Sequence, residues 1–432
     1  MSEFIASKLQ EWEFWFLLPL SSAWAQAVGW LLAALVHITL LINVVAGGAL
    51  LFIWLERKVS GRIQDRLGPT RVGGRFGWLQ TLADGIKLIQ KEDLVPEGAD
   101  RFLFRIAPYV SFCPAFAIYF ALPFSAGPGH SWVGQQLNVA VFFILAVLGV
   151  EVFGVILAGY GSASKWSLFG AMREAAQVVS YEVPLGLCVI VPVMIAGTMD
   201  LVAIGNMQAG WFTNWLVFHD PFTFVTFWVY FTCAMASVNR APFDLAEAES
   251  ELVAGFHTEY SGLRWSFFFM AEYGSMFSVS VLAAILFFGG WNGPVPITEF
   301  LGLTYAVSAT EWSLAGYLGG LIGMMNILLK GTLGVIVMIW VRWTLPRLRI
   351  DQVITTCLKY CTPIAAAMFL GAAVWTWYFP GGVLLKPSRP MGMTREGRPA
   401  DSSTTDLAQP SPYYESTTDY LPPSLANRKE VR

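Results

Sequence analysis

Eight apolar runs, each close to 20 residues long, constrain this chain more than any other feature of its sequence. A helix of about 20 residues crosses the roughly 30 Å hydrocarbon layer of a bilayer with its backbone hydrogen bonds satisfied. The runs predict an all-α fold: a polytopic membrane protein of about eight transmembrane helices plus interfacial amphipathic helices. The expected spans are Trp30–Leu55, Ile106–Phe124, Asn138–Tyr160, Ala175–Gly197, Phe222–Val238, Trp265–Phe288, Gly316–Val341 and Pro363–Phe379.

Composition agrees with this class and excludes others. The chain is 55% hydrophobic and only 13% charged, which a soluble protein of 432 residues does not show. A net charge of -3 argues against a nucleic-acid partner. The five Cys form no CxxC pair, with Cys357 and Cys361 expected in a short loop, and the four His are scattered. We therefore expect no metal site and no iron-sulfur cluster in this chain.

The chain divides by composition into three parts. Residues 1–29 are expected to form an N-terminal interfacial segment, because the apolar run Phe14–Leu20 is short and contains Pro19; a further span is the alternative. Lys8 is the only early basic residue, so the segment lacks the basic start of a cleavable signal peptide. Residues 30–380 form the expected membrane domain. Residues 381–432 are rich in Pro, Ser and Thr and are expected to be a disordered tail.

Basic residues give the orientation, because short loops rich in Lys and Arg stay on the cytoplasmic side. Most of the 27 Lys and Arg residues lie in alternate loops, above all in the loop after the first span. The intervening loops 125–137, 198–221 and 289–315 contain none. We expect a large cytoplasmic basic loop and both termini on the outer side.

Four charged residues fall within the expected spans: Glu151, Glu182, Glu272 and Lys330. A carboxylate at mid-membrane costs about 2.5–3.5 kcal/mol, so each one is a functional candidate. Glu182 and Glu272 are expected at similar depths, where they could face one cavity, and Lys330 could pair with one of the acids. Two interpretations stay open: structural ion pairs, or a polar path for protons. For Glu151 and Lys330 the argument is burial alone.

Five further acids lie between the fifth and sixth spans: Asp244, Glu247, Glu249, Glu251 and Glu259. If Glu247 and Glu251 share a helix, they lie on one face at positions i and i+4, where like charges repel. Stability alone would not favour that arrangement. A solvated acidic loop is the alternative to a proton-handling site.

The first inner loop carries Arg57 and Arg66 near the turn signal Gly68-Pro69. The following segment has apolar residues at positions 79, 82, 83, 86 and 89, which predicts an amphipathic helix lying at the membrane interface. Asp84 and Lys87 lie beside its apolar stripe. The segment is expected either to anchor the chain to anionic lipid or to line the mouth of a site for an amphiphilic substrate.

These motifs together resemble the H subunit of the proton-pumping NADH-quinone oxidoreductases, the quinone-proximal membrane subunit of respiratory complex I. The resemblance covers about residues 45–360. It rests on Glu56-Arg-Lys58, Arg66-Leu-Gly-Pro69, Leu82-Ala-Asp-Gly85, Ser180-Tyr-Glu-Val183, Asn239-Arg-Ala-Pro-Phe-Asp-Leu245, Glu247-Ala-Glu-Ser-Glu-Leu252, Glu259-Tyr260, Phe269-Met-Ala-Glu-Tyr273 and Trp343-Thr-Leu-Pro-Arg347.

The resemblance implies two sites and a set of partners. It implies that part of the chamber for reduction of quinone, the substrate, is formed by Glu56, Arg57, Arg66, Asp84 and Lys87. It also implies that an acidic funnel toward the proton-pumping arm is formed by Asp244, Glu247, Glu249, Glu251, Glu259, Glu182 and Glu272. The implied partners are a peripheral iron-sulfur subunit and neighbouring membrane-arm subunits in the inner membrane of a bacterium. This chain itself is expected to bind neither flavin nor cluster.

Two departures of the chain from the family pattern concern carboxylates. Family members generally carry Glu two residues before the Asn-Arg pair, where this chain has Ser237. Glu174 stands where a small residue is usual and restores a carboxylate nearby. Two other functions remain as alternatives: the equivalent subunit of a membrane-bound hydrogenase-type complex, and a stand-alone cation carrier.

Overall fold

Helices carry the eight expected spans in the computed structural model, which describes residues 22–127, 130–247, 249–301, 303 and 314–379. All of these residues belong to one unit, residues 1–388. The helices are α2 (Ser22–Ile63), α4 (Arg101–Ala121), α5 (Ala140–Gly161), α6 (Lys165–Ala196), α8 (Pro221–Ser237), α10 (Gly262–Phe287), α12 (Leu314–Thr344) and α14 (Thr362–Tyr378). The predicted all-α fold class is confirmed.

Within the described residues, six helices are long and apolar enough to cross a membrane: Arg101–Ala121, Ala140–Gly161, Lys165–Ala196, Gly262–Phe287, Gly316–Thr344 and Ile350–Tyr378. Pro221–Ser237 is a shorter apolar helix. The chain is therefore a multi-pass membrane protein. α2 has 42 residues, about 60 Å at 1.5 Å per residue, which exceeds the thickness of a bilayer.

Short elements connect the long helices. They are α3 (Gln80–Gln90), α7 (Leu201–Met207), α9 (Glu249–Leu252), α11 (Ile297–Phe300), α13 (Ile350–Ile354), the 3-10 turns Phe212–Asn214, Leu216–Phe218 and Gly255–His257, and the π-helical turn Thr355–Cys361. Strands β1 (Ser125–Gly127) and β2 (His130–Trp132) pair antiparallel, with Ala126 opposite Ser131. Cys357 and Cys361 thus lie in a helical turn and not in the loop that we expected, because the chain continues without a break from α13 into α14.

Side chains at the helix ends explain where several spans begin. Asp100 accepts hydrogen bonds from the backbone N–H groups of Phe102 and Leu103 and so caps α4. Asp220 caps α8 by accepting from Thr223 N, and Pro221 occupies the first helical position, where no hydrogen-bond donor is needed. The expected spans were placed from apolar periodicity without regard to these caps, so their predicted ends differ from the observed helix ends by a few residues.

α10 is the central helix of the bundle. In its most apolar 18-residue window 83% of the residues are buried, compared with 22% in the helix that ends at Tyr378. It packs against α2, α4, α6, α8 and α12. Polar side chains within that window are therefore held inside the protein, and Glu272 on the same helix has a side chain only 15% exposed.

Helices α4 and α5 approach closely because a glycine faces the contact. A Cβ atom added to Gly154 on α5 would lie 2.5 Å from the backbone N of Ser111 on α4. Small residues at such contacts let membrane helices pack backbone to backbone. This contact fixes the position of Glu151, three residues earlier on α5.

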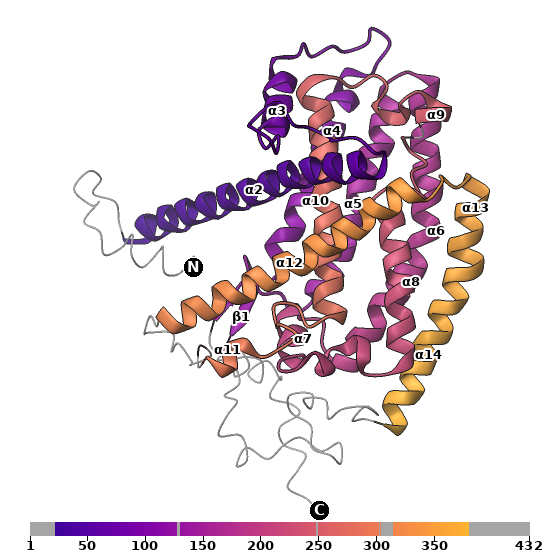
Figure 1. Ribbon diagram of the computed structural model, residues 1–432. Coiled ribbons are helices and arrows are strands. Elements are labelled where there is room, and N and C mark those ends of the chain that lie inside the picture. Colours follow the sequence, from indigo (N-terminus) through magenta and orange to yellow (C-terminus); the bar gives the residue numbers. More distant parts are fainter. Residues whose placement is uncertain (1–21, 128–129, 248, 302, 304–313, 380–432) are drawn as a thin grey trace, which may run out of the picture. The chain divides into compact units, whose positions relative to one another are not determined.

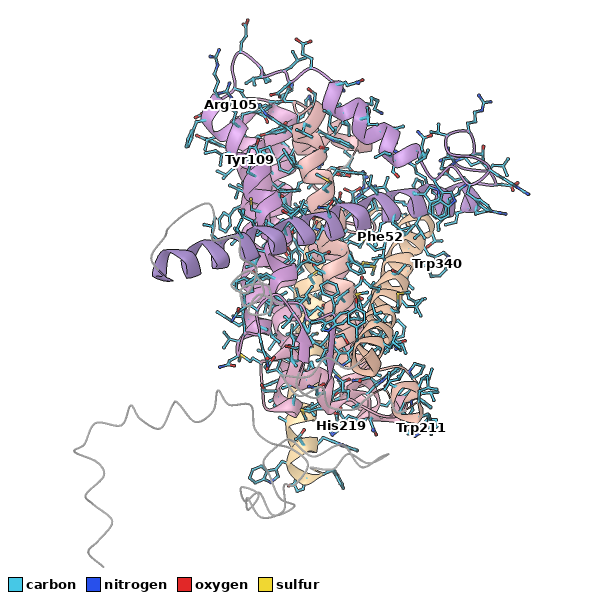
Figure 2. All side chains as sticks on the ribbon, turned by 90° about the vertical axis from the view of Figure 1, so that its left-hand side faces the viewer. Phe52, Arg105, Tyr109, Trp211, His219 and Trp340 are labelled. Atoms are coloured by element: carbon cyan, nitrogen blue, oxygen red, sulfur yellow. The ribbon has the colours of Figure 1, made fainter. Side chains whose placement is uncertain are left out.

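The connecting segments gather at two opposite ends of the bundle. Figure 1 shows α3 and α9, from the basic loops, at one end, and α7, α11 and β1, from loops without Lys or Arg, at the other. Figure 2 likewise shows Arg105 at one end and Trp211 and His219 at the other. Loops rich in Lys and Arg and loops without them alternate along the sequence, and these elements show that the two kinds lie at opposite ends of the bundle.

Two predicted segments fall largely outside the described residues. The expected N-terminal segment covered residues 1–29. Its last part, residues 22–29, is helical and continues the first span, because α2 begins at Ser22. Residues 1–21, which include Phe14–Leu20, are not among the described residues. Residues 380–432, the expected tail, are likewise not described.

Candidate functional site

A cavity of about 220 Å³ lies where α2, α10 and α12 meet, and we call it the first cavity. It is lined by Ile53, Glu56, Arg57, Ser60, Arg66, Phe269, Tyr273, Arg342 and Trp343. The Glu56 carboxylate is buried and accepts hydrogen bonds from Arg342 Nη1 at 2.8 Å and from the Tyr273 hydroxyl. The cavity therefore combines cationic donors with apolar and aromatic walls.

The predicted amphipathic helix is α3, and its ion pairs reach the first cavity. Asp84 on α3 forms an ion pair with Arg57 on α2, and Lys87 Nζ lies 3.4 Å from Asp84 Oδ1. Burial alone would raise the pKa of Asp84, but the hydrogen bonds and charges of Arg57 and Lys87 lower it below its ordinary value. Asp84 therefore stays ionised and fixes Arg57 at the cavity wall.

The loop between α2 and α3 folds back on α2. Trp54 stacks on Trp78 with ring centroids 4.1 Å apart, and Lys58 Nζ donates to Pro69 O at 2.6 Å. Gly68 has φ +65°, and a Cβ there would lie 2.9 Å from Arg57 O, so the predicted Gly-Pro turn requires glycine. This turn brings Arg66, which precedes it, into the cavity wall.

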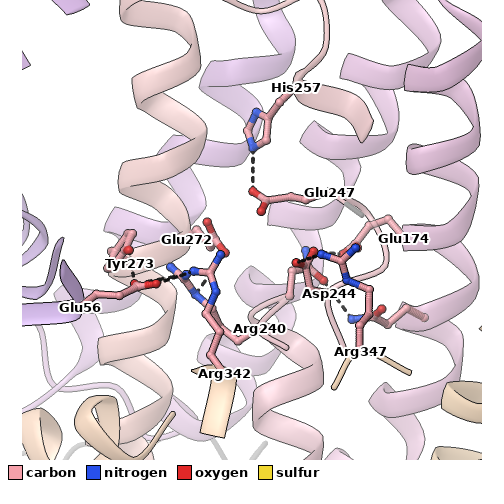
Figure 3. A network of polar contacts seen from close by, with 12 residues as sticks. Glu56, Glu174, Arg240, Asp244, Glu247, His257, Glu272, Tyr273, Arg342 and Arg347 are labelled. Carbon is pink, nitrogen blue, oxygen red and sulfur yellow. Dashed lines mark hydrogen bonds and ion pairs between the residues drawn. The ribbon is translucent and has the colours of Figure 1, made fainter. Parts of the chain in front are cut away.

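Arg240 connects the first cavity to a second polar region (Figure 3). Its side chain is 3% exposed; Nη1 lies 3.5 Å from Glu56 Oε2 and Nε lies 3.2 Å from Glu272 Oε1. The guanidinium also lies 4.4 Å from the centre of the Tyr273 ring. One buried cation thus contacts acids from α2 and α10.

The second cavity is smaller, about 30 Å³, which is room for a water molecule or two. It is lined by Ser111, Glu151, Val152, Val155, Glu174, Ser237, Val238, Asn239, Glu247, Phe256, His257, Phe268 and Glu272. Four carboxylates from different segments therefore share one enclosed space. Ser275 Oγ donates to Glu151, and His257 Nε2 lies 3.2 Å from Glu247 Oε1.

Consecutive residues of α10 face different cavities. Phe268 and Glu272 line the second cavity, whereas Phe269 and Tyr273 line the first. Successive side chains of a helix point about 100° apart, and residues four apart share a face. α10 is therefore the wall between the two cavities.

Residues 239–259, between the fifth and sixth spans, were expected on the inner side and are called the inner segment here; their acids separate in the structure. Glu247 lies before α9 and not on it, so the condition for Glu247 and Glu251 to share a helical face is not met. Backbone packing explains this, because Ala246 O lies against Gly255 and folds the chain back. Glu247 contacts His257, whereas Glu251 on α9 pairs with Arg173 at 2.7 Å at the surface.

Two of these acids have shifted pKa values. Burial and the nearby Glu247 carboxylate raise the pKa of Asp244 to about 6, although Arg347 Nη2 lies 2.9 Å from Asp244 Oδ2 and opposes the shift. Burial would also raise the pKa of Glu247, but the hydrogen bond and charge of His257 lower it. Glu251 and Glu259 line neither cavity, and the side chain of Glu249 is not among those described.

Two expectations about buried charges are wrong. Glu182 does not face one cavity with Glu272: it is exposed on α6, lines neither cavity, and has its Oε1 beside Gly149 on α5. Lys330 pairs with no acid among the described residues: its Nζ donates to Phe288 O, Gly290 O and Asn292 O at 2.5–2.9 Å. These carbonyls belong to the end of α10 and the loop that follows it, so Lys330 holds α12 against that loop.

Sequence reasoning did not single out Arg240, Tyr273, Arg342 or His257, which hold the acids in place. One signal was available: Tyr273 directly follows Glu272 in the chain, and Arg240 lies four residues before Asp244. For Arg342 and His257 nothing in the sequence indicates the partner. Among the described residues, no group of three or more His, Cys, Asp or Glu side chains could hold a metal ion.

Comparison with known proteins gives the family. The family model for NADH dehydrogenase matches residues 36–373. The chain is 46% identical over 330 residues to the H subunit of NADH-quinone oxidoreductase from Chlorobium luteolum, covering 76% of this chain and 85% of that protein. It is 43% identical over 373 residues to the corresponding protein of Chlorobaculum tepidum, covering 83% and 98% of the two chains. The chain therefore belongs to the NADH dehydrogenase family, together with the H subunits of NADH-quinone oxidoreductase.

Proposed function

We propose that this membrane subunit of NADH-quinone oxidoreductase forms one wall of the quinone-reduction chamber and an acidic route from it toward the proton-pumping arm. The observation that carries the proposal is Arg240, which contacts Glu56 at the first cavity and Glu272 at the second. A change of charge in one cavity therefore alters the electrostatic potential at the acids of the other cavity, because both contact the same buried cation.

The first cavity suits the head group of a quinone. Reduction adds two electrons and two protons, and Arg57, Arg66 and Arg342 supply positive charge where negative charge develops. Phe269 and Trp343 provide apolar contact for the ring. The volume is below the roughly 300–1000 Å³ of pockets that enclose a whole ligand. We infer that the peripheral iron-sulfur subunit, the source of electrons, completes the chamber.

The second cavity suits proton transfer. Glu151, Glu247 and Glu272 surround a space that holds a water molecule or two, and such a space lets a proton pass between carboxylates. Asp244 and Glu259 extend the acidic region near the inner end, with Glu249 and Glu251 on α9. Glu182 is exposed on α6, which supports a contact with a neighbouring membrane-arm subunit. The chain itself needs no flavin or cluster for these roles.

We propose that the protein lies in the bacterial inner membrane. The distribution of basic residues supports an orientation in which the end with α3 and α9 is cytoplasmic and both termini lie outside. The relatives reported above are quinone oxidoreductase subunits, which favours this function over a hydrogenase-type complex or a stand-alone carrier.

Quinone kinetics test the first cavity. Arg66→Ala and Asp84→Ala in the assembled complex should each lower kcat/KM for quinone at least about tenfold, equivalent to about 1.4 kcal/mol. NADH oxidation by a hydrophilic acceptor should persist. Arg71→Ala is the matched control, because Arg71 is exposed on the same loop and lines neither cavity. Normal quinone kinetics in both variants would leave α3 as a lipid anchor only.

A further inference from the structure

Glu174 on α6 is a carboxylate that the proposed route does not yet use. It is fully buried, with 0% exposure, and it lines the second cavity together with Ser237 on α8. Its Oε1 accepts a hydrogen bond from Asn239 Nδ2 at 2.9 Å, whereas its Oε2 is buried and makes no hydrogen bond with the described residues. An ionised, half-satisfied carboxylate in this position costs free energy, so packing alone does not account for it.

The neighbouring contacts hold Glu174 in one orientation. Gln177 Nε2 donates to Asn239 Oδ1 at 3.0 Å and to Ala236 O at 2.7 Å. With its oxygen occupied, Asn239 must turn its amide nitrogen toward Glu174. These hydrogen bonds, from Gln177 to Asn239 and from Asn239 to Glu174, therefore fix the position of Glu174 Oε1. The other oxygen, Oε2, remains available to the cavity.

Glu174 differs from the other cavity acids in its partners. Glu272 contacts Arg240, so protonation of Glu272 weakens an ion pair, and Glu247 contacts the His257 ring, so protonation of Glu247 changes that contact. Glu174 has a neutral amide donor, and Glu151 likewise has the Ser275 hydroxyl. These two acids can gain and lose a proton without breaking a salt bridge.

We propose that Glu174 is a proton-carrying residue of the second cavity, linking Glu151 on α5 to the acids of the inner segment. A proton that reaches the cavity water binds Oε2, which gives a neutral carboxyl group. The proton then leaves through the water to the Glu151 carboxylate, with no electron moved. The proposal rests on the proposed function, because it assumes that the second cavity conducts protons.

The test uses Glu174→Gln in the assembled complex. Glutamine keeps the Oε1 acceptor for Asn239 but cannot titrate. We expect normal assembly and normal NADH oxidation by a hydrophilic acceptor, with proton translocation coupled to quinone reduction lowered at least about tenfold. Glu97→Gln is the control, since Glu97 is an exposed carboxylate of the inner loop and lines neither cavity.

A second substitution separates proton transfer from structural support. Ser237→Glu adds a carboxylate from α8 to the lining of the same cavity, so it should restore translocation to Glu174→Gln. Translocation that stays at the wild-type level in Glu174→Gln, or a defect that Ser237→Glu does not rescue, overturns the proposal. If Glu272→Gln and Glu247→Gln also translocate normally, the proposed function of the cavity fails as well.

Infrared difference spectra provide a readout that a structural role would not change. On quinone reduction, the carboxylic acid carbonyl signal should lose one component in Glu174→Gln. Glu174→Asp keeps a titrating group, so the same component should shift in frequency, and this measurement holds even if the glutamine variant assembles poorly. Identical spectra for wild type and Glu174→Asp would contradict the proposal.

Discussion

Glu56 and Glu272 depend on the same buried guanidinium, although they lie on different helices and line different cavities. Removal of one partner from a buried ion pair costs about 3–5 kcal/mol, because the remaining charge is left in a low-dielectric environment. Arg342 also contacts Glu56, but its side chain is 24% exposed, so water screens that pair. The two arginines should therefore differ in their effect on stability.

Arg240→Met is expected to lower the amount of assembled complex severely, whereas Arg342→Met should have a smaller effect. The measurement is complex yield from membranes together with the temperature at which activity is lost. Arg71→Met, at an exposed position, serves as the control. Equal stability of the Arg240 and Arg342 variants would show that Arg240 does not stabilise both Glu56 and Glu272.

Asp244 should make stability depend on pH. Burial and Glu247 raise its pKa from 3.8 to about 6, so the folded protein binds a proton more tightly than the unfolded chain does. This contribution to stability is fully present below about pH 4 and is lost as the pH rises through about 6. Compared with Asp244→Asn, the wild-type complex should lose thermal stability between about pH 4.5 and 6.5. Parallel stability curves would contradict the shift.

The sequence indicated which charged residues belong to the candidate site more readily than it indicated which residues they contact. Glu151 and Glu272 stand out because a charge within an apolar run is costly. That Arg240 contacts Glu56, 184 positions away, follows only from the fold, which places the segment after α8 against α2. Glu182 shows the same limit, since depth along a helix does not say which way a side chain points.

At the scale of elements, periodicity predicted helices well and their ends less well. The apolar spacing of residues 79–89 gave α3 correctly, because an amphipathic helix needs no distant partner to be recognised. The inner segment did not form the longer helix that would align Glu247 with Glu251, because Ala246 packs against Gly255. Such a backbone contact leaves no pattern in the sequence.

The contact between α4 and α5 should be sensitive to a single methyl group. Gly154→Ala places a Cβ 2.5 Å from the Ser111 backbone, so the helices must move apart, at a cost of about 1–3 kcal/mol. Gly186→Ala on α6 is the matched control, because nothing lies within 4 Å of its added Cβ. We expect a lower melting temperature only for Gly154→Ala, measured on the purified complex; equal values would argue against the close contact.

At the scale of the whole molecule, the distribution of basic residues predicts which end of the bundle faces the cytoplasm. A cysteine introduced by Glu97→Cys should react only with reagents that reach the cytoplasm, and one introduced by Gln135→Cys only from outside. Both positions are exposed, and they lie in loops of opposite type. The reverse labelling pattern would refute the proposed orientation.

The position of α10 between the two cavities imposes a length constraint on the chain. Insertion or deletion of one residue between Gly262 and Phe268 would rotate the rest of the helix by about 100° relative to its start. Glu272 would then leave the acids, and Tyr273 would leave Glu56, in a single event. Substitutions can alter the two cavities one at a time, but a change in length alters both together. Natural variants of this protein should therefore differ in the residues of this stretch far more often than in its length.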